Sequence, residues 1–316
     1  GNAAFVPVFC DYLERRPRAD FQVLAQRVLG MLLISSGALV AVGMIASPWV
    51  IRLVAPGFLD DPDKFRMTIT LNRLLFPYLL LVTVAAYLMA LENALKSFAI
   101  PAATPVIFNL IMIGGIMLAA SHQGTAVYAV SAAVLVAGFG QIGFQLPSLK
   151  RLGLRWMPEA WRPSMFRDQG IRKIGRLMAP RILGTSVYQL NIFTDTIVGS
   201  LAAWVGDGAI AAIYFANRLV QLPFAVFGVA LSNAALPHLS SYVSRQETGR
   251  FHETLLFCLK GVFLGAIPVM FGFLVLSRPL VQAIFERGSF TSYSTDITAR
   301  ALFFYALGLI GYVGAR

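Results

Sequence analysis

Charged residues, cysteines and histidines are all scarce in this sequence. Only 13% of its 316 residues are charged, whereas about a quarter are charged in a typical soluble domain, and 57% are hydrophobic. A chain of this composition cannot build a water-exposed surface. The two cysteines stand singly in apolar runs and the three histidines are scattered. We therefore predict no disulfide, no metal site, no cofactor and no catalytic cluster.

Alternation of apolar and polar residues is also missing, which argues against a membrane β-barrel. Apolar stretches of about 20 residues or more recur instead, each long enough to cross a hydrocarbon core of about 30 Å as a helix. Because a span must satisfy its own backbone hydrogen bonds, we predict an all-α polytopic membrane protein. The predicted spans, about nine in number, lie near residues 2–13 (a partial helix), 23–54, 67–95, 101–120, 125–147, 176–203, 209–242, 251–284 and 296–314.

The net charge of +11 is concentrated in alternate loops. One set of loops holds Arg15, Arg16, Arg18, Lys96, Lys150, Arg151, Arg155, Arg162, Arg167, Arg172, Lys173, Arg176, Arg245 and Arg250, and the other holds only Lys64, Arg66, Arg278 and Arg287. By the positive-inside rule the first set faces the cytoplasm. Residues 148–175 then form a cytoplasmic connection, with room for an amphipathic helix at the membrane surface. The charge is topological on this interpretation, and we predict no nucleic-acid partner.

A sequence pattern recurs after about 230 residues. The run from Asn2 to Pro7, followed by Tyr12 and Arg15, returns as the run from Asn233 to Pro237, followed by Tyr242 and Arg245. A similar offset pairs Phe21 with Phe251, Pro48 with Pro279, Phe58 with Phe290, and Arg73, Phe76 and Tyr78 with Arg300, Phe303 and Tyr305. One period holds about six spans, an even number, so the two copies share one orientation and a pseudo-two-fold axis along the membrane normal.

The repeat indicates a two-lobed helical bundle. Its parts are an N-terminal lobe at residues 1–150, a cytoplasmic connection at 151–175 and a C-terminal lobe at 176–316. Paired bundles that rock around a midplane site suit alternating-access transport. Residues 176–232 have no counterpart in the first copy, and the chain opens without Met inside an apolar segment. We therefore expect the chain to be cut at both ends, with more helix before Gly1.

Several short runs, each weak alone, follow one another in a specific order. They include Ala4-Phe5-Val6-Pro7-Val8-Phe9, Ala55-Pro56-Gly57-Phe58, Arg73-Leu74-Leu75-Phe76-Pro77-Tyr78, Leu91-Glu92-Asn93-Ala94, Gln145-Leu146-Pro147 and Ala216-Asn217-Arg218-Leu219. Over essentially the whole chain they resemble the MurJ (MviN) lipid II flippases of the multidrug/oligosaccharidyl-lipid/polysaccharide exporter superfamily.

The resemblance implies a longer protein of the bacterial inner membrane. Such a protein moves undecaprenyl-pyrophosphate-linked disaccharide-pentapeptide, the lipid-linked peptidoglycan precursor, from the cytoplasmic to the periplasmic leaflet. The family's arginine-bearing first helix and its late, groove-forming helices have no counterpart here, so this chain alone would not be a complete flippase. We further expect a monomer among membrane lipids, coupled to the membrane potential or to a monovalent ion, with no enzymatic step.

Two predicted spans carry a polar face, as a charged substrate crossing hydrocarbon requires. In span 176–203 polar residues recur every three to four positions, and a polar face continues in span 209–242. The candidate substrate-binding residues are Arg181, Tyr188, Gln189, Asn191 and Asp195 in the first span and Asn217, Arg218 and Gln221 in the second. We expect both helices to line the transport cavity.

Arg218 lies about nine residues, or about 13 Å, inside its span, too deep to reach water easily at the near surface. In the resembling family the matching arginine is assigned to the pyrophosphate, and a guanidinium fork suits paired phosphate oxygens. A structural ion pair is the alternative. The short turn 204–208 predicts an antiparallel hairpin that brings Asp195 to the depth of Arg218. We therefore expect the two side chains to pair, directly or through water, when substrate is absent.

Other classes of function fit the sequence less well. A cation-coupled drug or metabolite exporter of the same superfamily would need a deep acidic cluster, for which Asp195 is the strong candidate. Asn217 and Gln221 stand where the family often has acids, which leaves an ion-coupling role at those positions open. A membrane enzyme acting on lipid pyrophosphates would need a His, Cys or carboxylate constellation, and a scaffold would have no need for polar faces on two consecutive spans.

Overall fold

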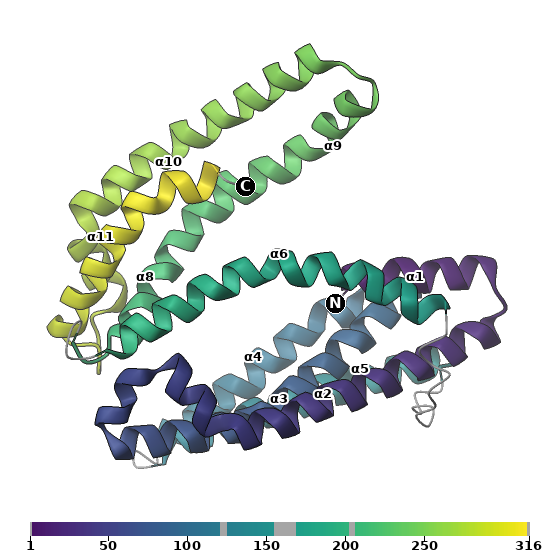
Figure 1. The fold of residues 1–316 in the computed structure, drawn as a ribbon, viewed down its shortest axis with the longest axis horizontal. Coiled ribbons are helices and arrows are strands. Elements are labelled where there is room, and N and C mark those ends of the chain that lie inside the picture. Colours follow the sequence, from purple (N-terminus) through teal and green to yellow (C-terminus); the bar gives the residue numbers. More distant parts are fainter. Residues whose placement is uncertain (1, 121–124, 155–168, 202–205, 315–316) are drawn as a thin grey trace. The chain divides into compact units, whose positions relative to one another are not determined.

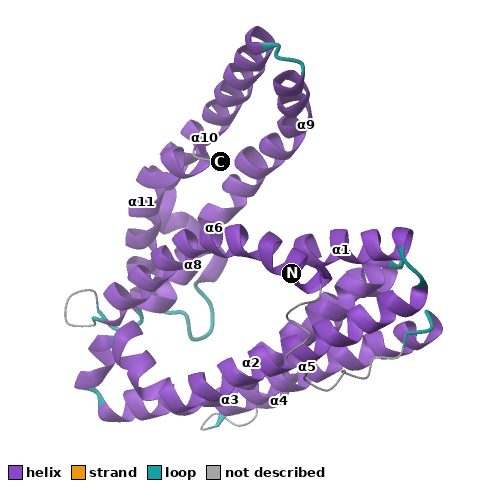
Figure 2. Cartoon of the chain, turned by 45° about the vertical axis from the view of Figure 1, so that its right-hand side comes forward, coloured by secondary structure: helices purple, strands orange, loops and turns teal. Residues whose placement is uncertain are grey.

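A computed structural model describes residues 2–120, 125–154, 169–201 and 206–314 of the chain. These residues are almost entirely helical, and no strand occurs among them (Figure 2). The predicted all-α fold class is confirmed. Residues 155–168, the middle of the predicted connection 148–175 with its room for an amphipathic helix, lie outside the described part.

The chain divides into two compact units, residues 1–192 and 193–316. The helix α6 (Gln169–Ser200) begins in the first unit and ends in the second. The predicted lobes 1–150 and 176–316, with their connection 151–175, stay a prediction.

The first unit is a bundle of long helices that lie lengthwise against one another (Figure 1). They are α1 (Asn2–Arg15), α2 (Arg18–Val54), α3 (Pro62–Ala94), α4 (Ala99–Ala120) and α5 (Ala126–Arg151), with the short 3₁₀ helix η1 (Pro56–Asp60) between α2 and α3. The start of α3 is fixed by the side chain of Asp61, which accepts hydrogen bonds from the backbone of Asp63 and Lys64 at 3.1 and 3.0 Å. Lys96, with φ of 61°, ends the same helix in a left-handed turn.

An aromatic cluster forms the core of the first unit. The ring of Phe9 meets Phe21 and Tyr87 edge to face, with centroids 5.8 and 6.1 Å apart. The buried hydroxyl of Tyr87 donates to the backbone oxygen of Ala25 at 2.6 Å, so its one polar atom is satisfied. These contacts join α1, α2 and α3.

Two of the predicted basic segments, the α1–α2 turn and the 148–175 connection, meet at one end of the first unit. Arg18, after the α1–α2 turn, donates to the backbone oxygen of Leu152 just beyond α5. Lys173 near the start of α6 forms an ion pair with Asp11 of α1 at 2.8 Å. Asp61 and its turn belong to the other end of α2 and α3. Within this unit the arrangement agrees with loops that alternate between two membrane faces.

The second unit contains the last part of α6 together with α8 (Ala209–Pro223), α9 (Ala230–Ser244), α10 (Thr248–Phe285) and α11 (Ser292–Gly314). A π-helical segment, η3 (Phe224–Val229), joins α8 to α9. Its Phe227 ring lies over Gly265 of α10, where a Cβ atom would come within 2.3 Å of the ring. The absence of a side chain at Gly265 is therefore what admits the π-helical segment against α10.

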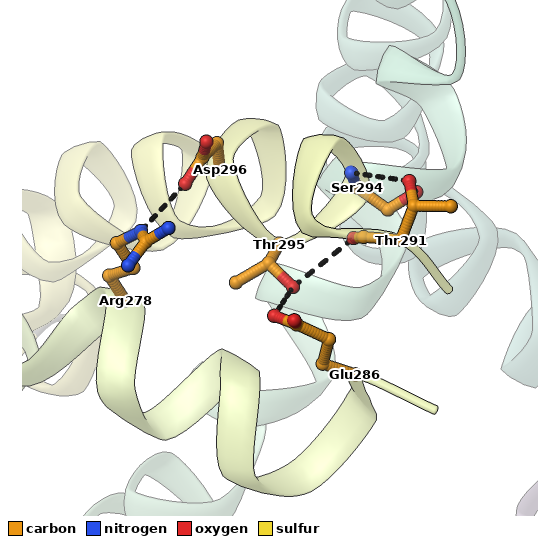
Figure 3. A network of polar contacts seen from close by, with 6 residues as sticks. All are labelled: Arg278, Glu286, Thr291, Ser294, Thr295 and Asp296. Atoms are coloured by element: carbon orange, nitrogen blue, oxygen red, sulfur yellow. Dashed lines mark hydrogen bonds and ion pairs between the residues drawn. The ribbon is translucent and has the colours of Figure 1, made fainter. Parts of the chain in front are cut away.

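Polar contacts join the ends of the helices in the second unit (Figure 3). Arg278 of α10 forms an ion pair with Asp296 of α11 at 2.7 Å, and the Thr295 hydroxyl donates to Glu286 at 2.7 Å. Tyr293 reaches the backbone oxygen of Asp207 ahead of α8 at 3.3 Å. The turns that carry Asp207 and Glu286 therefore lie at one end, and the α9–α10 turn with Arg245 lies at the other end of α10.

Seven helices in the described part are long and apolar enough to cross a membrane. They are α2, α3, α4, α5, the continuous segment Ala209–Ser244, α10 and α11. Each corresponds to a predicted span. The segments 2–13 and 176–203 form helices, α1 and α6, but are not among the seven, so the number of nine spans stays a prediction.

The order of elements repeats as the sequence repeat predicts. In each unit a short helix, a long helix and a third helix follow one another, as α1, α2 and α3 or as α9, α10 and α11. The short helices end at Arg15 and Ser244, the long helices run from Arg18 to Val54 and from Thr248 to Phe285, and the third helices begin at Pro62 and Ser292. These bounds lie about 230 residues apart throughout, close to one repeat period. Superposition of the two copies stays a prediction.

Candidate functional site

One face of α8 carries a continuous chain of polar side chains. Arg218 donates from Nη2 to the Tyr214 hydroxyl at 2.8 Å and from Nη1 to Oε1 of Gln221 at 3.2 Å. Gln221 in turn donates from Nε2 to Oδ1 of Asn217 at 2.7 Å. The four residues are three or four positions apart and therefore share one side of the helix.

The opposite face of α8 is apolar and buried. Ala216 and Val220 belong to a core cluster that also contains Leu302 and Leu309 of α11. Small residues on this face allow α8 and α11 to approach closely, as is usual between membrane helices. Packing against α11 therefore turns the polar chain away from the core of the unit.

The Arg218 guanidinium is held in place and still exposed. It lies over the Tyr214 ring, 4.9 Å from the centroid, in addition to its two hydrogen bonds. A guanidinium has five N–H donors, and the contacts among the described residues use two of them. The remaining donors, together with the fixed orientation, suit an anion with several acceptor oxygens.

The helix becomes irregular two residues after the polar chain. Pro223 ends α8, and the π-helical segment Phe224–Val229 follows it. Such segments are frequent at functional sites because they change the direction of the following helix relative to the preceding one.

Asp195 and Arg218 make no direct ion pair, so the direct form of the predicted pairing was wrong. Its Oδ2 atom accepts a 2.7 Å hydrogen bond from the hydroxyl of Tyr305 on α11. Arg218 makes its contacts with its own helix instead. Counting residues from the turn placed the two side chains at one depth, but it did not fix the direction in which either side chain leaves its helix.

The remaining candidates on α6 are only partly described. Gln189 is exposed. Arg181, Tyr188 and Asn191 lie on α6, and their side chains are outside the described part of the chain. Near the turn, Gly199 of α6 lies against Ile210 and Ile213 of α8, as the predicted hairpin requires. A cavity lined by both helices stays a prediction.

Two residues of this region had little signal in the sequence. Tyr214 belongs to the polar face but matters as the acceptor that orients Arg218. Tyr305 stands out in the sequence only as the repeat partner of Tyr78, and no local pattern marks it as the donor to Asp195. A donor contributed by a helix 110 residues away can be found only after the chain has folded.

The seven apolar helices and the internal order of elements define a multi-pass helical membrane protein. The particular family follows from comparison with known proteins. A family model described as lipid II flippase MurJ matches residues 2–316, so the chain belongs to the MurJ family. The family recognised from the short sequence runs is confirmed.

Individual relatives agree with this assignment. The lipid II flippase MurJ of Burkholderia cenocepacia is 30% identical over 312 residues, which cover 99% of this chain and 60% of that protein. The probable lipid II flippase MurJ of Haemophilus influenzae is 30% identical over 330 residues, covering 99% and 62%. The chain thus spans about three fifths of the length of these curated relatives.

A solved structure shares the fold. It is described as lipid II flippase MurJ in an inward closed conformation, and it matches with a TM-score of 0.75 at 24% identity. The match covers 98% of this chain and 62% of that chain. At this identity the likeness concerns the path of the chain.

Proposed function

We propose that this chain is part of a lipid II flippase. The full-length protein would move undecaprenyl-pyrophosphate-linked peptidoglycan precursor from the cytoplasmic to the periplasmic leaflet of the bacterial inner membrane, by alternating access. The observation that carries the proposal is the match of the MurJ family model to residues 2–316. A cation-coupled drug exporter of the same superfamily is not favoured by that match.

Arg218 is the residue that we assign to the pyrophosphate. A phosphate charge in a low-dielectric membrane interior is very unfavourable unless cations and hydrogen-bond donors replace water. Arg218 supplies a positive charge and free donors, and Tyr214 and Gln221 hold its plane in one orientation. Asn217 extends the polar surface along the helix for the sugar and peptide groups.

Residues of α6 complete the proposed substrate path. The substrate would contact Gln189, Asn191, Tyr188 and Arg181. Asp195, which is held by its hydrogen bond to Tyr305, would act as a fixed negative charge. Flipping involves no covalent step in this scheme. We propose that the membrane potential or a monovalent ion supplies the energy and that the protein works as a monomer surrounded by membrane lipids.

Depletion of the full-length protein tests the proposal. Cells from which it is removed should accumulate lipid-linked peptidoglycan precursor on the cytoplasmic side and lose their shape, and the wild-type gene should restore both. Accumulation is measured by extraction and mass analysis, and sidedness by an enzyme that cleaves only precursor exposed on the periplasmic face. Normal periplasmic precursor in fully depleted cells would contradict the proposed function.

A further inference from the structure

Glu92 is a fully buried carboxylate in the first unit. It lies two residues before the end of α3, and its exposed fraction is 0%. Neither Oε1 nor Oε2 has a hydrogen-bond partner among the described residues. An ionised carboxylate in this position, with no hydrogen-bond donor and no cation beside it, would strongly destabilise the fold.

One face of α5, a helix that packs against α3, carries buried polar side chains. Gln141, Gln145 and Ser148 are four and three residues apart, so they share one face of a helix that packs against α3. The Ser148 side chain lies close to Glu92, but it makes no well-formed hydrogen bond with either carboxylate oxygen. Gln145 is also 0% exposed.

The orientation of the Gln145 amide is fixed by its own hydrogen bond. Its Nε2 atom donates to the backbone oxygen of Gln141 at 2.9 Å, so its Oε1 atom must point elsewhere. That Oε1 atom has no donor, and neither has Oε1 of Gln141. This side of the bundle therefore buries more hydrogen-bond acceptors than donors. A positive charge would satisfy the acceptors that have no donor.

No charged side chain compensates Glu92 among the described residues. Lys96 beyond α3, and Lys150 and Arg151 at the end of α5, are exposed, and none of them interacts with the carboxylate. Leu88 and Leu91 of α3 and Leu149 of α5, which are near Glu92 and Ser148 in the sequence, belong to the hydrophobic core of the first unit.

A groove leads from the surface to the same place. It has a volume of about 670 Å³ and lies between the start of α4 and the end of α5. Ser97, Pro147, Ser148 and Arg151 line it. Ser148 lines the groove and lies close to Glu92, so one side chain separates a small ion in the groove from the carboxylate.

We propose that Glu92 binds one monovalent cation, a proton or a sodium ion, which enters through this groove. A single positive charge neutralises the single carboxylate, whereas a divalent ion would leave a net charge in an apolar surrounding. A proton would let Glu92 donate to a free acceptor such as Oε1 of Gln145, and a sodium ion would take the same oxygen and the Ser148 hydroxyl as ligands. The site lies in another unit than Arg218 and does not depend on the flippase function.

Infrared difference spectroscopy on the purified full-length protein in nanodiscs tests this site. Spectra of wild type and Glu92→Gln are compared at pH 7, once in sodium chloride and once in choline chloride. A carboxylic-acid C=O band that is missing in Glu92→Gln identifies a bound proton. A Glu92 carboxylate band that shifts between sodium and choline identifies a bound sodium ion. An ionised Glu92 whose band is the same in both salts overturns the proposal.

Three further variants make the result specific. Glu253→Gln removes an exposed acid of α10 and should leave the band assigned to Glu92 unchanged. Gln145→Leu keeps Glu92 but removes the free acceptor, so it should shift the acid band or weaken the sodium response several-fold. This second variant also tests the site if Glu92→Gln fails to fold. A Glu92 band that is insensitive to Gln145→Leu and to Ser148→Ala would contradict the site.

Discussion

The hydroxyl of Tyr305 on α11 donates a 2.7 Å hydrogen bond to the carboxylate of Asp195 on α6. Both residues belong to the second unit, and Asp195 is half-buried. The bond holds the end of α6 to α11 and leaves the guanidinium of Arg218 to its own helix. The carboxylate of Asp195 on α6 and the guanidinium of Arg218 on α8 therefore have different partners in this unit.

Replacing Tyr305 by Phe should destabilise the full-length protein by about 1.5–3 kcal/mol, because a hydrogen bond to a charged group is lost. Asp195→Asn should be milder, because the amide oxygen can still accept from Tyr305. A double-mutant cycle measured by thermal unfolding checks the pairing. Tyr305→Phe and Asp195→Ala should be coupled, whereas Asp195→Ala and Arg218→Ala should add to within about 0.5 kcal/mol. Strong coupling between Asp195→Ala and Arg218→Ala would instead support an ion pair between these two residues, which the structure lacks.

Arg218→Ala should abolish flipping in the full-length protein while changing its thermal stability little, because the side chain is exposed and makes contacts only within α8. Arg218→Lys should retain part of the activity, since it keeps the charge but loses the two-pronged donor geometry. Complementation of a depleted strain and the level of periplasmic precursor are the measurements.

Arg245→Ala is the matched control for Arg218→Ala. Arg245 is an exposed arginine at the end of α9, outside the polar chain, and its replacement should leave complementation intact. Full growth of the Arg218→Ala strain would remove the proposed pyrophosphate contact. Tyr214→Phe, which removes only the hydroxyl acceptor, should lower activity less than Arg218→Ala does.

Gly265→Ala should destabilise the second unit by about 1–3 kcal/mol, because the new methyl group would meet the Phe227 ring at 2.3 Å. The clash includes Cγ of Phe227, so rotation of the side chain alone does not relieve it. Gly272→Ala in the same helix has open space around the added carbon and should be neutral or stabilising by up to about 1 kcal/mol. Thermal unfolding of both variants is compared, and equal effects would argue against the tight contact with the π-helical segment.

Thiol labelling should divide the loops into two groups. In a full-length protein with Cys10 and Cys258 replaced by Ser, cysteines at positions 16 and 250 should react only after the inner membrane is opened. Cysteines at positions 61 and 207 should react with a membrane-impermeant reagent in intact cells with a permeable outer membrane. The distribution of basic residues is the physical reason. Labelling of position 16 from outside would reverse the proposed topology.

The apolar runs, the charge distribution and the repeat determine much of this protein by themselves. Segments such as 23–54 and 251–284 are too apolar and too long for anything except a buried or membrane helix, and the helices α2 and α10 occupy them. The lipid environment makes these helices simple to predict, because the backbone hydrogen bonds of each span must be satisfied within that span. The polar face of Asn217, Arg218 and Gln221 is equally local, since residues three or four apart on a helix meet whatever surrounds them.

Tertiary packing determined the side-chain partners and the burial that a sequence pattern cannot show. The partner of Asp195 is Tyr305 because of how α6 and α11 are rotated about their own axes, and a one-dimensional count gives depth but not rotation. Glu92 sits near a helix end in the sequence, where an acid is ordinarily hydrated, yet α5 and the aliphatic core close over it completely. Burial and partners arise from the way helices pack side by side, so they were fixed only when the chain folded.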